Sequence, residues 1–249
     1  MTPPLSPFYR RVALDQTAST NDEALARARD GAAEGTLVTA DRQSAGRGRR
    51  GREWVSPAGN LHLSLILRPP GGTEAAGAIG FAAALAVRDA VLGALPAGTT
   101  VTVKWPNDVL IDGAKVAGLL IETAEDALVL GVGINVVAHP ENTPYPATSI
   151  LAAGGAGTAD SVLAAFCAAF KSRYDRWAVQ GFAALREEWL ASAHGLGQGI
   201  VVRLEDARFD GVFAGIDDSG ALMLDLGTAG LKKITAGDVF FTPARAGGA

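Results

Sequence analysis

The sequence predicts an α+β protein in which a mixed, mostly antiparallel sheet packs with helices and is followed by a small β-barrel. Three observations support this prediction. Short apolar runs follow one another closely between residues 101 and 137, as in consecutive β-hairpins. Longer patterns typical of helices lie on both sides of these runs, and after residue 195 only short strand-like runs remain. We therefore expect a large domain over residues 1–195 and a small β domain over residues 196–249.

The composition is that of a folded protein without disulfides. Of the 249 residues, 48% are hydrophobic and 19% are charged, which supplies a sizeable core and excludes overall disorder. The formal net charge of −4 argues against nucleic acid as the main partner. Cys167 is the one cysteine, which suits a reducing cytoplasm. The longest charge-free apolar stretch, residues 75–87, is shorter than the roughly 20 residues that cross a bilayer, so we expect no membrane partner.

The first third of the chain predicts a helix followed by two strands with a loop between them. Thr20 and Glu23 have the spacing of a capping box, which places the start of a helix at Thr20. In order, we expect a short, loop-flanked segment at residues 12–17, this helix, a strand at 35–40, a loop at 41–53 and a second strand at 61–67.

The rest of the chain predicts the central hairpins, three further helices and the small β domain. An alanine-rich helix at residues 74–95 precedes the hairpins. Asp160 is expected to cap a long helix that ends near Trp177, and another helix covers residues 182–193. The remaining strands are expected at 101–105, 109–111, 115–122, 127–137, 200–204, 209–216, 221–226, 231–234 and 238–242.

The loop at residues 41–53 concentrates positive charge. Its arginines are Arg42, Arg47, Arg49, Arg50 and Arg52. The run from Gly46 to Gly51 matches the spacing of a dinucleotide-binding loop, but no helix follows and no acidic residue lies about 20 positions on, which excludes that fold motif. Guanidinium groups pair bidentately with carboxylates and phosphates, which favours an anionic ligand. The alternatives are a solvated run of charge or a patch for nonspecific DNA binding.

Two lysines and a carboxylate flank a predicted hairpin. Lys104 and Asp108 lie on either side of a Trp-Pro-Asn turn, and Lys115 begins the strand that returns from the next turn. A lysine in an otherwise apolar strand is costly to bury without a counter-anion. Each lysine therefore either reaches water at the end of the sheet or faces a ligand.

Glycines interrupt the last apolar strand of the large domain. Gly131 and Gly133 precede Asn135 in this strand. Glycine in a strand costs stability unless another group approaches closely, so the pattern predicts either a bulge or a close contact. The Asn135 amide both donates and accepts hydrogen bonds, which suits an adenine edge as well as a backbone pair.

These motifs, in this order, resemble those of the biotin protein ligases. The resemblance covers about residues 12–243. Its motifs are Ser19-Thr20-Asn21, the run from Gln43 to Arg52, Trp54, Lys104 to Asp108, Lys115 to Gly118, and Gly131 to Asn135. The resemblance implies a catalytic domain like that of the class II synthetases and a C-terminal β-barrel like an SH3 domain.

The resemblance also implies an activity, a cofactor and partners. Such a ligase makes biotinyl-5′-AMP from biotin and Mg·ATP, and then transfers biotin to one lysine of a biotin carboxyl carrier domain, as in acetyl-CoA carboxylase. Mg²⁺ is the implied cofactor, and pairing through the sheet edge would give a homodimer. Eighteen residues precede Ser19, too few for the DNA-binding helix-turn-helix domain of many bacterial relatives, so we expect ligase activity alone.

The resemblance implies a role for each matching residue. The implied biotin-binding residues are Ser19, Thr20, Asn21, Gln43, Arg47, Gly48, Arg49 and Lys115. The implied nucleotide-binding residues are Arg52, Trp54, Lys104 and Asn135. The implied catalytic residues are Arg49, Asp108 and Lys115, and Asp108 would also lie near the metal.

Two other functions compete with biotin ligation. A lipoate ligase or octanoyltransferase has a related catalytic fold and also acylates a carrier lysine, but the loop from Gly46 to Gly51 favours biotin. A nucleic-acid-binding module could use the arginines of this loop. The net charge of −4 and the absence of interleaved aromatic residues in the loop speak against that module.

Overall fold

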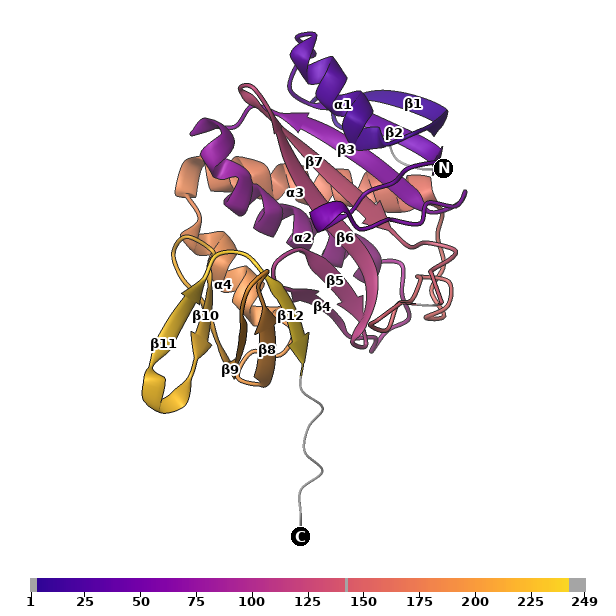
Figure 1. Ribbon diagram of the computed structural model, residues 1–249. Coiled ribbons are helices and arrows are strands. Elements are labelled where there is room, and N and C mark those ends of the chain that lie inside the picture. The colour runs from indigo at the N-terminus through magenta and orange to yellow at the C-terminus, as the bar shows by residue number, and fades with distance from the viewer. Residues whose placement is uncertain (1–3, 142, 242–249) are drawn as a thin grey trace.

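The computed structural model describes residues 4–141 and 143–241, and it confirms the α+β class (Figure 1). The α-helices are α1 (Thr20–Arg29), α2 (Ala76–Leu92), α3 (Ala159–Gln180) and α4 (Ala183–Ala191), with short 3-10 turns η1 (Arg49–Gly51), η2 (Gly72–Ala75) and η3 (Gly227–Ala229). The strands are β1 (Arg10–Thr17), β2 (Thr36–Gln43), β3 (Leu61–Leu67), β4 (Val101–Lys104), β5 (Asp108–Ile111), β6 (Ala114–Ala124), β7 (Ala127–Ile134), β8 (Gly199–Arg203), β9 (Arg208–Ile216), β10 (Leu222–Asp225), β11 (Leu231–Ile234) and β12 (Asp238–Phe241).

Seven strands form the large sheet, in the order β1-β2-β3-β7-β6-β5-β4. β1 and β2 run parallel, and each of the other neighbouring pairs runs antiparallel. The expected mostly antiparallel sheet is therefore confirmed. The consecutive hairpins from β4 to β7 place the turn between β4 and β5 beside Gly118 of β6, because Asp108 pairs with Gly118.

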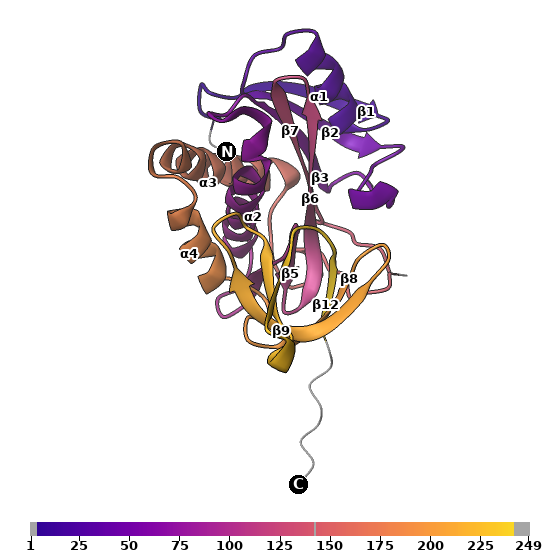
Figure 2. The ribbon, with the colours of Figure 1, turned by 60° about the vertical axis from the view of Figure 1, so that its left-hand side comes forward.

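Helices cover both faces of the large sheet (Figure 2). The interior strand β3 explains why, because all seven of its residues are buried. Leu63 and Leu65 pack into the main core with α2 and α3, whereas Ile66 packs with Leu25 of α1 in a smaller core. Since the side chains of a strand point alternately to its two faces, both faces need a cover. α1 provides it on the face where the candidate site forms.

The alanine-rich helix is the one described helix that is long and apolar enough to cross a membrane, over Gly72–Leu92. Within its most apolar window, 61% of the residues are buried inside the protein. Ile79, Leu85 and Val87 are fully buried between the sheet and α3. Packing in the core therefore accounts for the apolar character of this helix.

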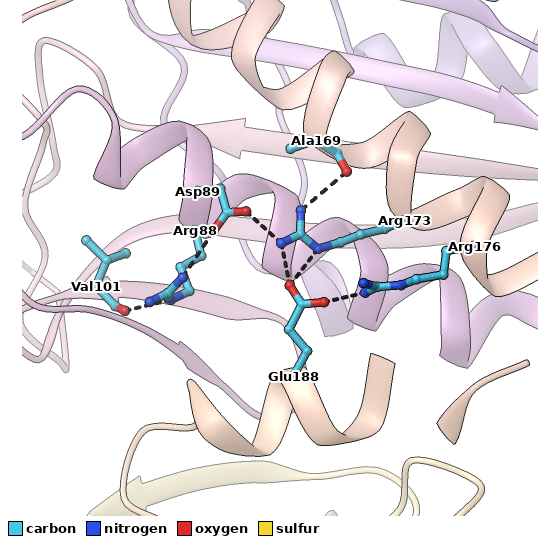
Figure 3. Close-up of polar contacts among 7 residues, drawn as sticks. All are labelled: Arg88, Asp89, Val101, Ala169, Arg173, Arg176 and Glu188. Carbon is cyan, nitrogen blue, oxygen red and sulfur yellow. Dashed lines mark hydrogen bonds and ion pairs between the residues drawn. The ribbon is translucent and has the colours of Figure 1, made fainter. Parts of the chain in front are cut away.

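Ion pairs join the three helices that lead to the small sheet (Figure 3). Arg173 of α3 donates from Nη2 to Asp89 of α2 at 2.6 Å, and it also pairs with Glu188 of α4. Arg176 pairs with the second oxygen of Glu188. Although burial opposes the charge on Glu188, the two arginines hold the pKa of its carboxyl below the usual range. The network fixes α4, which carries the chain into the small sheet.

The small sheet is antiparallel throughout, in the order β11-β10-β9-β8-β12. Contacts with the turn between β4 and β5 and with α4 hold it in place. Trp105 Nε1 donates to the Gly220 carbonyl at 3.0 Å, and Arg186 Nε donates to the Ile216 carbonyl at 2.8 Å. The rings of Trp189 and Phe213 meet edge to face. Because Trp105 lies in the turn between β4 and β5, the small sheet is held beside that turn.

Two helix starts differ from the expectation. Ser19 is the N-cap of α1 and makes no side-chain cap bond, while the Thr20 hydroxyl donates to Gln43, so the expected capping box of Thr20 and Glu23 is wrong. Thr158 caps α3 in a capping box with Ser161, whereas Asp160 pairs with Arg11. In each case the side chain that the local pattern had placed at the cap instead bonds to a residue distant in sequence.

Candidate functional site

One cavity lies where α1, β6 and β7 of the large sheet meet the loop at residues 46–54, called the arginine loop below. The turn between β4 and β5 and the start of β12 complete its wall. The sequence-predicted residues that line it are Ser19, Thr20, Asn21, Gln43, Arg47, Gly48, Arg49, Arg52, Trp54, Lys104, Asp108 and Lys115. Residues from four distant parts of the chain thus share one cavity.

Asn135 is the predicted site residue that the structure places elsewhere. It is 2% exposed and is absent from the cavity lining. Its side-chain amide donates to the Thr148 carbonyl at 3.0 Å, and its backbone N–H donates to the Val116 carbonyl at 2.8 Å. The sequence left two partners open for this amide, an adenine edge and a backbone group, and the structure shows a backbone group.

A network of uncharged polar groups forms the end of the cavity at α1. The backbone N–H and the hydroxyl of Thr20 both donate to Gln43 Oε1, at 2.8 and 3.0 Å. Ser64 Oγ lies 2.8 Å from Thr20 Oγ1 and 2.5 Å from Asn21 Oδ1. Asn21 Nδ2 donates to Glu122 Oε2 at 2.7 Å. These bonds fix the orientation of several donors and acceptors that can receive a polar, uncharged ligand group.

The two glycines of β7 leave room for side chains of the site. A Cβ at Gly131 would lie 2.2 Å from Asn21 Oδ1, and a Cβ at Gly133 would lie 2.4 Å from the Trp54 ring. The expected close contact is therefore observed, and the occupants are the side chains of Asn21 and Trp54. Trp54 Nε1 is buried and has no hydrogen-bond partner among the described residues. A buried indole N–H usually has an acceptor, so Trp54 is suited to contact a ligand here.

Lys115 and Asp108 form an ion pair in the cavity. Lys115 Nζ lies 2.6 Å from Asp108 Oδ1, and each side chain is 15% exposed. A bulge between β5 and β6 shifts the register beside these residues and sets the position of Lys115. The ammonium also lies 5.5 Å from the centres of the Trp54 and Tyr145 rings. Lys115 thus faces the cavity rather than bulk water.

Lys104 lies against two aromatic rings. Its Nζ lies 5.9 Å from the ring centre of Tyr145 and 5.7 Å from that of Phe241. Burial lowers the pKa of Lys104, and the charge of Lys115 lowers it further, while Asp108 acts in the opposite direction. An incoming anion would relieve this cost.

The arginine loop has acidic partners that its neighbourhood in the sequence does not show. Arg47 donates to both carboxylate oxygens of Asp22, at 2.8 and 2.6 Å, and this bond raises its pKa. Arg52 pairs with Asp238 of β12 at 2.6 Å. Arg49 donates to Asn107 Oδ1 at 3.3 Å, and burial lowers the pKa of its guanidinium. Arg49 therefore faces the cavity without a carboxylate within ion-pair distance in the described part of the chain.

The sequence assigned no role to several polar residues of the site, namely Glu53, Ser64, Asn107, Glu122, Tyr145 and Asp238. Ser64 could have been found, since it is a lone hydroxyl in the apolar strand β3. Asp238 could not, because it lies 186 residues from its partner Arg52 and no local pattern marks it.

The chain matches known proteins along both of its parts. The family model described as the biotin/lipoate A/B protein ligase family matches residues 13–137, and the model for the biotin protein ligase C-terminal domain matches residues 195–242. The chain is 43% identical to the biotin–[acetyl-CoA-carboxylase] ligase of Paracoccus denitrificans, covering 92% of this chain and 99% of that one. It is 38% identical to the ligase of the same name from Mycobacterium tuberculosis, covering 90% and 86%.

A solved structure agrees with these sequence matches. The biotin protein ligase from Aquifex aeolicus in complex with biotin and ATP superposes with a TM-score of 0.81 at 27% identity, covering 95% of this chain and all of that one. The fold, the shared cavity and the matches along the sequence together show that this chain belongs to the biotin protein ligase family.

Proposed function

We propose that the chain ligates biotin to a lysine of a biotin carboxyl carrier domain, through biotinyl-5′-AMP and at the expense of ATP. One observation carries this proposal. A single cavity joins a network of uncharged polar groups to a cluster of cations, and biotin itself has an uncharged ureido ring at one end and a carboxylate at the other. The names of the Paracoccus and Aquifex relatives support the same activity.

The network at α1 is proposed to bind the ureido ring. Ser19, Thr20, Asn21 and Gln43 lie there with donors and acceptors already oriented by one another. Arg47 and Gly48 border the same pocket from the arginine loop. Because the groups are paired before ligand arrives, little ordering would oppose binding.

Adenylate formation requires two anions to meet. A carboxylate oxygen of biotin attacks the α-phosphorus of ATP, a new P–O bond forms, and the bond to the pyrophosphate oxygen breaks. Lys115 and Arg49 line the cavity with positive charge that offsets the repulsion and stabilises the charge on the phosphate oxygens. Asp108 holds Lys115 in place through the 2.6 Å ion pair.

The nucleotide is proposed to lie between the aromatic and cationic walls. Trp54 offers a ring face and an unpaired N–H, and Lys104 and Arg52 offer charge for phosphate oxygens. In this proposal Asn135 supports the nucleotide site without lining the cavity, because its side-chain amide bonds to the Thr148 carbonyl and so holds the segment around Thr148 against the end of β7.

Mg²⁺ is proposed to enter together with ATP. No cluster of three or more His, Cys, Asp or Glu side chains that could hold a metal occurs in residues 4–141 and 143–241. Mg²⁺ is commonly held by one or two carboxylates with substrate phosphates and water, and Asp108 supplies one such carboxylate in the cavity. When bound there, the ion would neutralise phosphate charge.

Transfer completes the reaction. The neutral amine of the carrier lysine attacks the acyl carbon of biotinyl-5′-AMP, the bond to the phosphate oxygen breaks, AMP leaves, and the new amide loses a proton. We propose that residues 1–195 form the catalytic domain and residues 196–249 the small domain, and that the reaction takes place in the cytoplasm. Homodimer formation through the sheet edge remains a prediction.

Pyrophosphate release by the purified chain tests this function. We expect release to require both biotin and Mg·ATP, and lipoate to be unable to replace biotin. Biotin at 100 times its Kd should also stabilise the fold by about 2.7 kcal/mol in a thermal unfolding assay. Equal responses to lipoate would favour a lipoate ligase, and no response to either acid would contradict the proposal.

A further inference from the structure

Asp238 connects the small sheet to the arginine loop. It begins β12, its side chain is 25% exposed, and it lines the cavity. Arg52 Nη2 lies 2.6 Å from Asp238 Oδ1, and Arg50 Nη1 lies 3.3 Å from Oδ2. Although burial opposes its charge, the bond to Asp238 raises the pKa of Arg52. One carboxylate therefore receives two neighbouring arginines of the loop.

The two sides of this contact are held in different ways. The small sheet is held to the turn between β4 and β5 by the Trp105 bond to Gly220, and to α4 by the Arg186 bond to Ile216. The arginine loop instead contains three glycines, and Arg50 adopts a left-handed conformation with φ of 56°. A residue with a side chain is disfavoured in the left-handed region, so a contact from outside the loop is needed to hold Arg50 in this conformation. Asp238 provides this contact.

The ion pairs also divide the roles of the loop arginines. Arg47 is held by Asp22 at one end of the loop, and Arg50 and Arg52 are held by Asp238 at the other. Between them, Arg49 bonds to the neutral Asn107 and faces the cavity. Anchoring both ends leaves the charge of Arg49 for the ligand.

We propose that Asp238 is a positioning residue through which the small domain holds the arginine loop over the ligand cavity. This inference deepens the proposed function and rests on it for the identity of the ligand. Without Asp238, the loop would have to be ordered by the incoming nucleotide. The cost would appear as weaker binding, and chemistry on the bound substrates would change little.

Trypsin provides a test that does not depend on activity, because it cleaves after arginine only where a segment opens locally. We compare the full-length Asp238→Asn variant with Asp210→Asn as a matched control. Asp210 pairs with Arg208 on the same sheet, away from the cavity. In the ligand-free protein, we expect cleavage within residues 46–54, located by mass spectrometry, to be about five-fold faster in Asp238→Asn. The control should match the unmodified chain, and Asp238→Glu should restore slow cleavage.

Kinetics distinguish positioning from general damage to the fold. In pyrophosphate release, we expect Asp238→Asn to raise the KM for ATP about three- to ten-fold while kcat stays within about two-fold of the unmodified chain, consistent with the modest strength of exposed ion pairs. If Asp238→Asn does not fold, the unmodified chain is compared at low and high salt, because screening should then speed loop cleavage.

The outcomes separate this inference from the proposed function. The inference is overturned if the loop of folded Asp238→Asn is cleaved no faster than that of Asp210→Asn. Where the salt comparison is used instead, it is overturned if cleavage of the unmodified chain does not depend on salt. Both conclusions hold whatever the activity. Absence of pyrophosphate release in every chain, the unmodified one included, contradicts the proposed function, and the cleavage rates still decide the role of Asp238.

Discussion

At the scale of single residues, the site consists of side chains that fix one another before a ligand arrives. Thr20 and Gln43 share hydrogen bonds, and Lys115 and Asp108 share an ion pair, in each case between segments distant in sequence. The sequence identified these residues as candidates because it resembles a known family. It could not show their pairing, because a contact across the fold leaves no local pattern.

Replacing Lys115 or Asp108 by alanine should slow adenylate formation while the fold persists. Each change removes a charge worth about 1.5–3 kcal/mol in a charge-assisted bond, which corresponds to roughly ten- to hundred-fold in rate. Pyrophosphate release at saturating biotin measures the effect. Lys171→Ala is the control, because Lys171 forms a pair of the same length with Asp175 on α3, outside the cavity. Rates near those of the control in both variants would remove Lys115 and Asp108 from the reaction.

Buried His62 should make the fold sensitive to acid. Its ring is 1% exposed, and burial lowers its pKa from the ordinary value of 6.5. The unfolded chain therefore binds more protons than the folded one as the pH falls, so the stabilisation is complete above about pH 6.5 and is lost as the pH drops toward the folded pKa. His194 contributes in the same direction, since burial also lowers its pKa.

The substitution His62→Phe should reduce this pH dependence. We expect the loss of unfolding free energy between neutral pH and pH about 5 to be smaller than in the unmodified chain, because one titrating group is gone. Urea denaturation at a series of pH values measures it, with His139→Phe, in a partly exposed loop position, as the control. An unchanged slope in His62→Phe would show that His62 does not titrate with folding.

At the scale of elements, β7 is built to admit side chains from elsewhere. Its pattern of apolar residues and glycines predicted either a bulge or a close contact, and the structure shows the contact. The order of the strands after β1, and of most helices, followed from hydrophobic periodicity, whereas the pattern at β1 was too short to predict a strand. The starts of α1 and α3 did not, because Thr20 and Asp160 are bound by Gln43 and Arg11 rather than by their own helices.

The substitution Gly133→Ala should destabilise the chain through Trp54. The new Cβ would lie 2.4 Å from the indole, so we expect a cost of about 1–3 kcal/mol, typical of overpacking. In a Trp54→Ala background the same change should cost much less, because the ring that it meets is gone. Gly80→Ala, whose Cβ would lie 3.5 Å from Ile121, is the control. Equal costs in the two backgrounds would show that Trp54 does not explain the glycine.

At the scale of the whole molecule, the cavity is shared between the two sheets. The large sheet supplies the polar network and the lysines, and the small sheet supplies Asp238 next to the arginine loop. The composition change after residue 195 predicted a separate β unit, but not that it lines the cavity. The position of this unit at the cavity depends on the contact between Trp105 and Gly220, which joins distant parts of the chain and leaves no local pattern in the sequence.

Arg49→Gly should release the reactive intermediate. Arg49 faces the cavity from a glycine-rich loop, and losing a charge-assisted bond of about 1.5–3 kcal/mol should raise the dissociation rate of biotinyl-5′-AMP roughly ten- to hundred-fold. Bystander lysines on serum albumin should then become biotinylated, as streptavidin blots would show. Arg208→Gly, on the exposed face of the small sheet, is the control. An unchanged dissociation rate without albumin labelling would contradict a retaining role for Arg49.

The most direct test of the account is the intact mass of a biotin carboxyl carrier domain incubated with this chain, biotin and Mg·ATP. We expect the carrier to gain the mass of one biotinyl group. The gain should disappear when ATP is omitted, or when the acceptor lysine of the carrier is replaced by arginine. A carrier that keeps its original mass here, although a characterised biotin protein ligase modifies the same preparation, would contradict the proposed function.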